Sequence, residues 1–259
     1  MESRLQQFGA WILLACESAG FTVALGVQAL LRCGDLRLRA RETLQQMFHC
    51  GVLSLPVVAL VGVFSGMVLA LQAGIQLGDF GQEENIGMVV GLAMVREMGP
   101  IMTAIILAGM VGSAMAAEVG TMSVSEEVDA LRVMAIDPVS FLVLPRLLGM
   151  LLMAPVMTVY ADIIGLIGGG VVSKHQLGVH YSIYFNKAMD SLVMTDVVSG
   201  LVKAVVFAAI IATISCAQGL RAVNGAEDVG KAVRNSVVIS FVLIIVFNYF
   251  LTSFTRPLY

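Results

Sequence analysis

Five long apolar runs dominate this sequence and restrict its fold more than any other feature. A helix needs about 20 apolar residues to cross the hydrocarbon core of a bilayer, and it satisfies its own backbone hydrogen bonds there. Only 13% of the residues are charged, about half the share found in a soluble domain. We therefore expect an all-α membrane protein with five transmembrane helices. The runs are residues 52–73, 86–117, 141–172, 199–218 and 237–254.

The amino-terminal segment 8–31 is also mostly apolar, but it is less uniform than the five runs. Four polar residues interrupt it, namely Glu17, Ser18, Thr22 and Gln28. Its length would allow it to span the membrane, and its polarity would allow it to lie within one leaflet, so both placements are open. Because no small-residue cleavage pattern follows, we expect the segment to be retained rather than removed as a signal peptide.

The positions of lysine and arginine predict how the spans are oriented. Most of these residues fall on one side of a five-span arrangement, namely Arg4, Arg32, Arg37, Arg39, Arg41, Arg132, Arg146, Arg221, Lys231 and Arg234. Lys174, Lys187 and Arg256 fall on the other side. Since cytoplasmic loops carry the excess of positive charge, the segments 118–138 and 221–234 are predicted to be cytoplasmic. The carboxyl terminus then lies on the opposite, outer side.

The charged stretch 118–138 joins the second and third runs and predicts a short amphipathic helix. Ser123 and Glu126 have the spacing of a capping box, and Pro138 disfavours helix at the residue before it, so the predicted helix covers 123–136. Its apolar side holds Val124, Val128, Leu131 and Ala135, and its charged side holds Glu126, Asp129 and Arg132. Such a helix suits a membrane surface or a protein surface rather than the bilayer core.

Three charged residues interrupt the apolar runs: Arg96 and Glu97 in the second run, and Lys203 in the fourth. A charge at the bilayer centre costs about 2.5–3.5 kcal/mol on insertion scales, so these residues should face one another or a cavity. Pro100 has no N–H and predicts a bend just after them. The residues alone leave open an ion pair that orders the bundle or a polar lining for a substrate passage. The position of Asp162 is also left open, since this residue could lie in the interior of the bundle or near the membrane interface.

Catalytic and metal-binding motifs are absent from the sequence. The cysteines Cys16, Cys33, Cys50 and Cys216 form no C-x-x-C pair, and the histidines lack neighbouring carboxylates or thiols. Residues 225–232 imitate a phosphate-binding loop but lack its final hydroxyl and follow a membrane helix rather than a strand. We therefore predict no metal site, no catalytic residue and no binding of nucleic acid.

Several motifs around the charged stretch resemble the MlaE family of permeases. They are G-V-F-S-G-M-V-L-A-L-Q at 62–72, R-E-M-G-P at 96–100, A-E-V-G-T-M at 117–122, E-E-V-D-A-L-R-V-M-A-I-D-P at 126–138 and P-R at 145–146. The resemblance runs from about Gln46 to the carboxyl terminus. It implies one permease domain over 1–259, with an amino-terminal helix and basic connection in 1–45 and a five-span core in 46–259. It also implies that the first helix lies in the cytoplasmic leaflet.

The resemblance further implies a function. The chain would be a multi-pass inner-membrane subunit, not an enzyme, of an ABC transporter that moves phospholipids between the inner membrane and a periplasmic lipid-binding ring and so maintains outer-membrane asymmetry. Its implied partners are phospholipid, a second copy of itself in a homodimer, an MlaF-type ATPase, an MlaB-type regulatory subunit and an MlaD-type ring. No cofactor is expected in this chain, because ATP and magnesium would be bound by the ATPase.

Site residues follow from the same resemblance. The polar residues expected at a lipid cavity are Arg96, Glu97 and Lys203, and the wall candidates are Leu69, Gln76, Phe80 and Met98. The residues expected on a coupling helix at the ATPase are Glu126, Glu127, Asp129, Leu131 and Arg132.

Two alternatives from other functional classes remain at this point. One is an ion-coupled secondary transporter that uses Glu97, Asp162 and Lys203 as coupling groups. It would work in an ion gradient without nucleotide. The other is a membrane scaffold that only anchors partners, which would retain no lipid when purified.

Overall fold

A computed structural model describes residues 2–32 and 39–255, with side chains from residue 16 onward. All regular structure within these ranges is helical. Five helices are long and apolar enough to cross a membrane, which confirms the five predicted spans. They cover Ala40–Gly78, Glu83–Val124, Val139–His175, Met194–Gly219 and Ala226–Thr255. The predictions made for Cys33, Arg37, Arg256 and the side chain of Arg4 lie outside the described residues.

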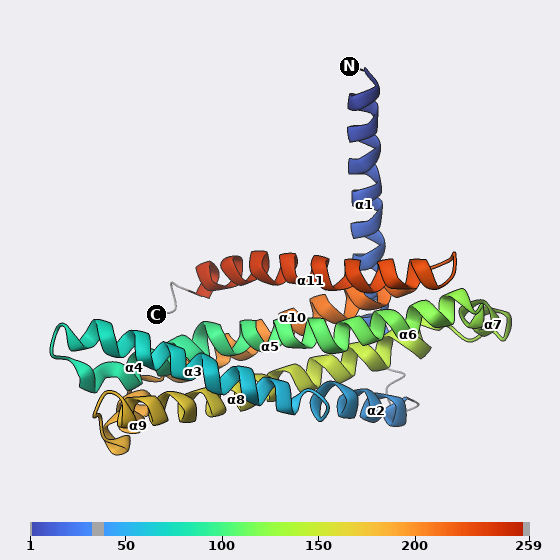
Figure 1. Cartoon of the computed structure of the whole chain (residues 1–259). Helices are drawn as coiled ribbons and strands as arrows, with labels where there is room; N and C mark the ends of the chain where they lie inside the picture. The colour runs from blue at the N-terminus through green and yellow to red at the C-terminus, as the bar shows by residue number, and fades with distance from the viewer. Residues whose placement is uncertain (1, 33–38, 256–259) are drawn as a thin grey trace.

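The spans lie side by side in one bundle (Figure 1), and irregular turns divide the first three into shorter helices. The α-helices are α1 (Glu2–Leu31), α2 (Ala40–Gly51), α3 (Leu55–Gly78), α4 (Ile86–Ala93), α5 (Gly99–Leu107), α6 (Ser113–Val124), α7 (Glu127–Val133), α8 (Leu144–His175), α9 (Tyr181–Ser191), α10 (Met194–Gly219) and α11 (Ala226–Thr255). A 3-10 turn precedes α4 at η2 (Glu83–Asn85), and π-helical turns lie at η3 (Met94–Met98), η4 (Ala108–Gly112) and η5 (Val139–Val143).

Small residues bring α3 and α8 into close contact. Gly62 lies against the backbone of Ala161, and Gly66 lies against the backbone of Gly165. A side chain at Gly66 would overlap the carbonyl group of Gly165, so no larger residue fits without moving a helix. In lipid, where apolar burial drives helix association only weakly, such close backbone approach is a main source of packing energy.

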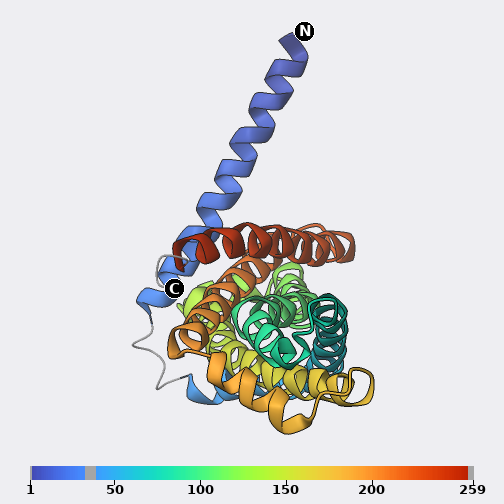
Figure 2. The same ribbon diagram turned by 90° about the vertical axis from the view of Figure 1, so that its left-hand side faces the viewer.

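Helix α1 stands apart from the bundle and runs crosswise to the spans (Figures 1 and 2). Its second half is attached to the bundle through Leu25 and Ala29, which are buried. Arg221, on the connection between α10 and α11, donates to the hydroxyl of Ser18 and stacks on the ring of Phe21, 4.9 Å from its centroid. These contacts fix α1 beside one end of the bundle rather than among the spans.

The end of the bundle that carries α7 also carries α2 and the connection from α10 to α11 (Figure 1). Most of the described lysines and arginines that the five-span arrangement puts on one side lie at this α7 end. The opposite end carries α9 and the turn from α3 to α4, beside the carboxyl-terminal end of α11.

The predicted helix over 123–136 is wrong in its boundaries. Helix α6 continues to Val124, the chain turns at Glu126, whose φ is 60°, and α7 covers only Glu127–Val133. Ser123 lies in the last turn of α6, and its hydroxyl donates to the carbonyl of Leu220 at 3.4 Å. The expected capping box is therefore absent: Glu126 stands at the N-cap and makes no side-chain cap bond. Ala135 leaves the helical region with a φ of 58°.

Candidate functional site

The second span carries its charged residues on an irregular turn. Arg96 and Glu97 lie in the π turn η3, and Gly99 and Pro100 begin α5 directly after it. Pro100 stands four positions after Arg96 and has no N–H to donate to its carbonyl group. Nζ of Lys203, from α10, donates to this carbonyl at 2.8 Å. A π turn next to the proline thus replaces the simple bend that the sequence predicted, as is frequent at functional sites.

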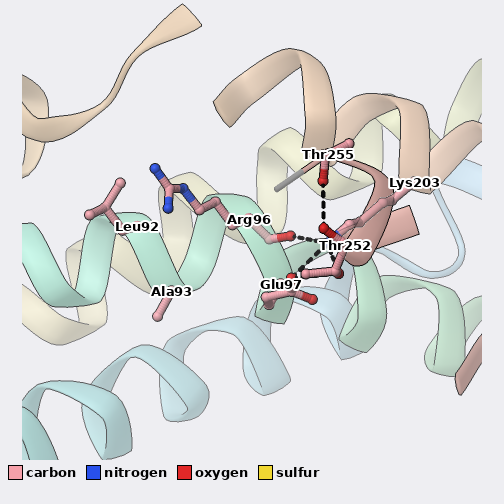
Figure 3. Close-up of a pocket in the computed structure, with 7 residues that line it drawn as sticks. All are labelled: Leu92, Ala93, Arg96, Glu97, Lys203, Thr252 and Thr255. Carbon is pink, nitrogen blue, oxygen red and sulfur yellow. Dashed lines mark hydrogen bonds and ion pairs between the residues drawn. The ribbon is translucent and has the colours of Figure 1, made fainter. Parts of the chain in front are cut away.

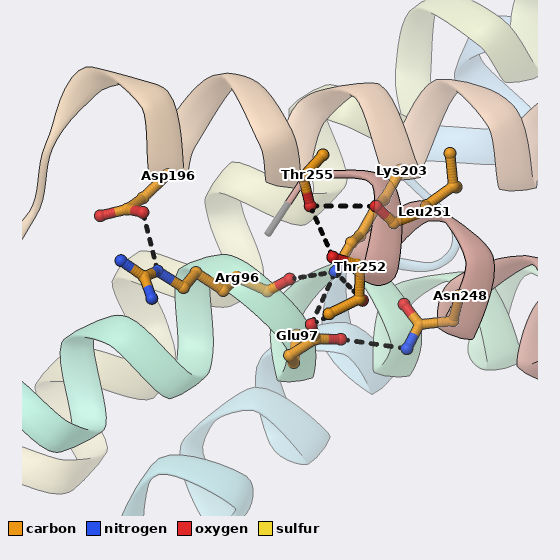
Figure 4. Close-up of polar contacts among 8 residues, drawn as sticks. All are labelled: Arg96, Glu97, Asp196, Lys203, Asn248, Leu251, Thr252 and Thr255. Atoms are coloured by element: carbon orange, nitrogen blue, oxygen red, sulfur yellow. Dashed lines mark hydrogen bonds and ion pairs between the residues drawn. The ribbon is translucent and has the colours of Figure 1, made fainter. Parts of the chain in front are cut away.

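Lys203 and Glu97 form a buried ion pair, with Nζ 2.7 Å from Oε1 (Figure 4). Lys203 is only 1% exposed, so its charge depends on these partners. Helix α11 completes the arrangement from the other side. Thr252 accepts from Lys203 and donates to Oε1 of Glu97, both at 2.8 Å, and the amide of Asn248 donates to Oε2 at 3.0 Å.

Arg96 is held by Asp196, with Nε 2.7 Å from Oδ1 (Figure 4). Asp196 is fully buried near the start of α10, and its Oδ2 accepts the backbone N–H of Val193, which caps that helix. Asp196 therefore fixes Arg96 and the beginning of α10 to each other. We refer to Arg96, Glu97, Asp196, Lys203, Asn248 and Thr252 as the polar cluster.

Three of the six residues of the polar cluster were not predicted from the sequence. Asp196 falls just before the fourth apolar run, so the sequence does not mark it as a charge within a span. Asn248 and Thr252 are neutral and lie inside the fifth run, so they raised no charge signal. Their spacing of four residues, which places two polar groups on one face of an apolar helix, is the signal that would have found them.

A cavity of about 420 Å³ opens beside the polar cluster (Figure 3). It is lined by Leu92, Ala93, Arg96, Glu97, Lys203, Thr252 and Thr255. The structure thus brings Arg96, Glu97 and Lys203 together at one cavity, although Lys203 lies more than 100 residues away from the other two. We call this the polar cavity. It combines a half-buried guanidinium with apolar walls, which suits a ligand that has both charged and apolar parts.

The four predicted wall residues do not share the polar cavity in the single chain. Leu69 and Met98 line a separate apolar cavity of about 390 Å³ together with Leu60 and Phe64. Gln76 is exposed on α3. Phe80 is 79% exposed on the turn that follows α3. The common lipid-facing wall therefore stays a prediction.

The predicted coupling residues divide into two groups. Glu126, Glu127, Asp129 and Arg132 are exposed, and Arg132 pairs with Asp129 at 2.8 Å. Leu131 is buried with Val128 against Leu142 and so holds α7 on the bundle, and its place at the ATPase contact stays a prediction. The exposed apolar side chains of this region are instead Val133, which is 88% exposed, and Met134, which is 60% exposed.

Asp162 lies in the interior of the bundle, which decides the question that the sequence left open. It is buried on α8 and lies against Gly99, where a side chain would overlap its carboxyl group. Its Oδ1 has no hydrogen-bond partner within the described ranges. Asp162 does not line the polar cavity.

The imitation phosphate loop of residues 225–232 lies at the start of α11. Lys231, from the imitation phosphate loop, pairs with Glu227 at 2.8 Å and Asp228 at 3.2 Å as an ordinary helical surface charge. Residues 39–255, together with the side chains of 16–32, contain no group of three or more metal-ligating side chains. Cys16, Cys50 and Cys216 are free thiols.

Five membrane-length helices, with a charged cluster fixed between three of the spans, define a multi-pass membrane protein. The chain belongs to the MlaE permease family, whose model matches residues 43–254. It is 42% identical over 210 residues to a probable ABC transporter permease protein of Rickettsia typhi, with 81% of each chain covered. It is 33% identical over 226 residues to the intermembrane phospholipid transport system permease protein MlaE of Haemophilus influenzae, with 87% of each covered. It is 37% identical over 227 residues to the chloroplastic protein TRIGALACTOSYLDIACYLGLYCEROL 1 of Arabidopsis thaliana, with 88% of this chain and 65% of the other covered. These findings confirm the resemblance, and none of them favours the ion-coupled secondary transporter.

Proposed function

We propose that this chain is the membrane subunit of an ABC transporter that moves phospholipids between the inner membrane and a periplasmic lipid-binding ring, and so maintains outer-membrane lipid asymmetry. The observation that carries the proposal is the polar cavity in a chain of this family. A phospholipid has a charged head and apolar tails, and the cavity offers Arg96 beside apolar side chains such as Leu92. Guanidinium groups bind phosphate oxygens through paired hydrogen bonds.

ATP hydrolysis is assigned to a separate MlaF-type chain, which would also bind the magnesium. Helix α7 is the proposed contact, because four charged side chains and the apolar Val133 and Met134 are exposed there. Since Leu131 and Val128 pack on Leu142 at the start of the third span, a push on α7 would be passed directly to that span. Helix α6 is the end of the second span, which also contains the irregular turn that carries Arg96.

The proposed assembly is a homodimer with an MlaB-type regulatory subunit on the cytoplasmic side and an MlaD-type ring on the periplasmic side. The excess of basic residues at the α7 end supports a cytoplasmic position for 118–138 and 221–234 and a periplasmic carboxyl terminus. The crosswise direction of α1 supports a helix that lies in the cytoplasmic leaflet. The exposed apolar face of α11, which includes Val242, Ile245 and Phe250, supports burial against lipid or against the second copy.

The proposal is tested by mass spectrometry of the lipids and protein subunits that copurify with the chain. We expect bound phospholipid and an ATPase subunit. A complex that holds no phospholipid, or a chain that transports substrate in an ion gradient without nucleotide, would contradict the proposal.

A further inference from the structure

Besides the polar cavity and the apolar cavity at Leu69, a smaller cavity lies near the α7 end of the bundle, where α2 and α3 meet. A turn at residues 52–54 joins these two helices, with Val52 and Ser54 in helical backbone conformation, and the wall opposite includes part of the π turn η4. The cavity lies between this turn and η4 and has a volume of about 120 Å³, and we call it the recess. Its polar lining consists of Gln46, His49, Ser54 and Glu118, and its apolar lining includes Leu53 and Met115. A π turn such as η4 is frequent at functional sites.

Ser54 indicates that the recess is built for a polar ligand. It stands directly before α3 in helical backbone conformation, and its side chain makes no cap bond to that helix. Ser54 is fully buried, and its Oγ has no hydrogen-bond partner within residues 39–255 or the described part of α1. Buried hydroxyl groups are nearly always satisfied, so the hydroxyl is available to a ligand in the recess.

Glu118 supplies a fixed acceptor next to this hydroxyl. Arg146 binds its Oε2 through Nη2 at 3.0 Å, and Arg146 is itself buried and donates to the carbonyl of Leu142 at 2.8 Å. Within the described residues no hydrogen bond reaches Oε1 of Glu118, so it can accept from a ligand. A carboxylate oxygen, a hydroxyl and an amide oxygen around one small space favour a ligand that donates several hydrogen bonds and carries a positive charge.

The depth of the recess identifies the source of such a ligand. Helix α3 contains 24 residues and is about 36 Å long, which alone crosses a hydrocarbon core of about 30 Å. Gln46 and His49 precede α3 and therefore lie at the level of the lipid headgroups. Leu53 lines the recess and is 53% exposed, so it offers apolar contact to acyl chains.

We propose that the recess binds the primary ammonium of a phosphatidylethanolamine headgroup. The ammonium donates three hydrogen bonds, to Oε1 of Glu118, to Oγ of Ser54 and to the side-chain oxygen of Gln46. A choline headgroup has no N–H to donate and carries three methyl groups, so the recess discriminates against it. This lipid site is separate from the polar cavity, and it requires a phospholipid membrane but no transport.

The test places a photo-crosslinking amino acid at position 53 of the assembled complex in nanodiscs that contain equal amounts of phosphatidylethanolamine and phosphatidylcholine with the same acyl chains. We expect crosslinks mainly to phosphatidylethanolamine. Ser54→Ala should lower this crosslinking about tenfold, because one hydrogen bond to a charged donor is lost. Ser240→Ala is the matched control, since Ser240 is also buried with an unpartnered hydroxyl but lies on α11 outside the recess. The control should crosslink like the wild type.

Equal crosslinking of the two lipids, or an unchanged yield in Ser54→Ala, would overturn the inference. Displacement of the lipid by soluble phosphoethanolamine at equal concentration would also overturn it, because the site would then bind a free headgroup. ATP-dependent lipid transfer is measured in the same samples. If the complex transfers lipid with ATP but position 53 crosslinks both lipids equally, this inference alone is refuted. If position 53 crosslinks mainly phosphatidylethanolamine but no lipid is transferred, the proposed function alone is refuted.

Discussion

Replacement of Lys203 by methionine should destabilise the bundle strongly, because it keeps most of the side-chain volume and removes the charge. Glu97 would lose its ion pair, and the carbonyl of Arg96 would lose a donor. Removal of one partner from a buried pair costs about 3–5 kcal/mol. The side chain of Glu97 is 30% exposed and keeps its bonds to Asn248 and Thr252, so we expect the low end, about 3 kcal/mol.

The assay is thermal unfolding of the purified complex in detergent, followed by tryptophan fluorescence or by loss of soluble protein. A loss of this size corresponds to a Tm about 6–12 °C lower, on the scale measured for domains of 150–250 residues. The double variant Lys203→Met with Glu97→Gln should recover at least half of the loss, because glutamine removes the unpaired charge and still accepts from Thr252.

Two results would refute this reasoning. The first is a Lys203→Met variant that melts like the wild type, which would mean that water or lipid compensates Glu97 fully. The second is a double variant that is no more stable than the single one, which would mean that the ion pair is not the source of the loss.

Three further predictions concern other parts of the chain. Reversal of charge in Glu126→Lys with Glu127→Lys should abolish ATPase binding or stimulation in pull-down and hydrolysis assays; normal transport with a bound ATPase would contradict it. Arg96→Ala should lower the phospholipid retained per complex several-fold by mass spectrometry while the subunits still assemble, and unchanged occupancy would leave Arg96 a purely structural role. Gly66→Leu should prevent accumulation of folded protein, since its side chain would overlap Gly165, whereas Gly109→Leu, at an open position, should be tolerated in the same expression assay.

The spans were predictable from the sequence because membrane insertion depends on local hydrophobicity. Each run of about 20 apolar residues is sufficient evidence on its own, whatever it packs against. The grouping of Arg96, Glu97 and Lys203 was predictable for a related reason, since charges in apolar surroundings must find partners. Asp196 was not assigned to them, because its burial follows from where α10 begins and from how that helix packs.

The boundaries of the short helix α7 could not be predicted from the sequence. The spacing of Ser123 and Glu126 fits a capping box, but α6 extends through Ser123 and the chain turns afterwards. Local patterns cannot show which of two adjacent helices takes the residues between them. For the same reason the sequence could not show that Leu131 packs on Leu142.

The most direct test of the account is whether nucleotide changes the lipid occupancy of the polar cavity through α7. A photo-crosslinking amino acid at position 92, on the wall of that cavity, reports bound phospholipid in the reconstituted complex with and without ATP. If α7 passes the force of ATP hydrolysis to the cavity, ATP should lower crosslinking in the wild type and have no effect in the Glu126→Lys, Glu127→Lys variant. Crosslinking that ignores ATP in the wild type, or that falls equally in the variant, would contradict it.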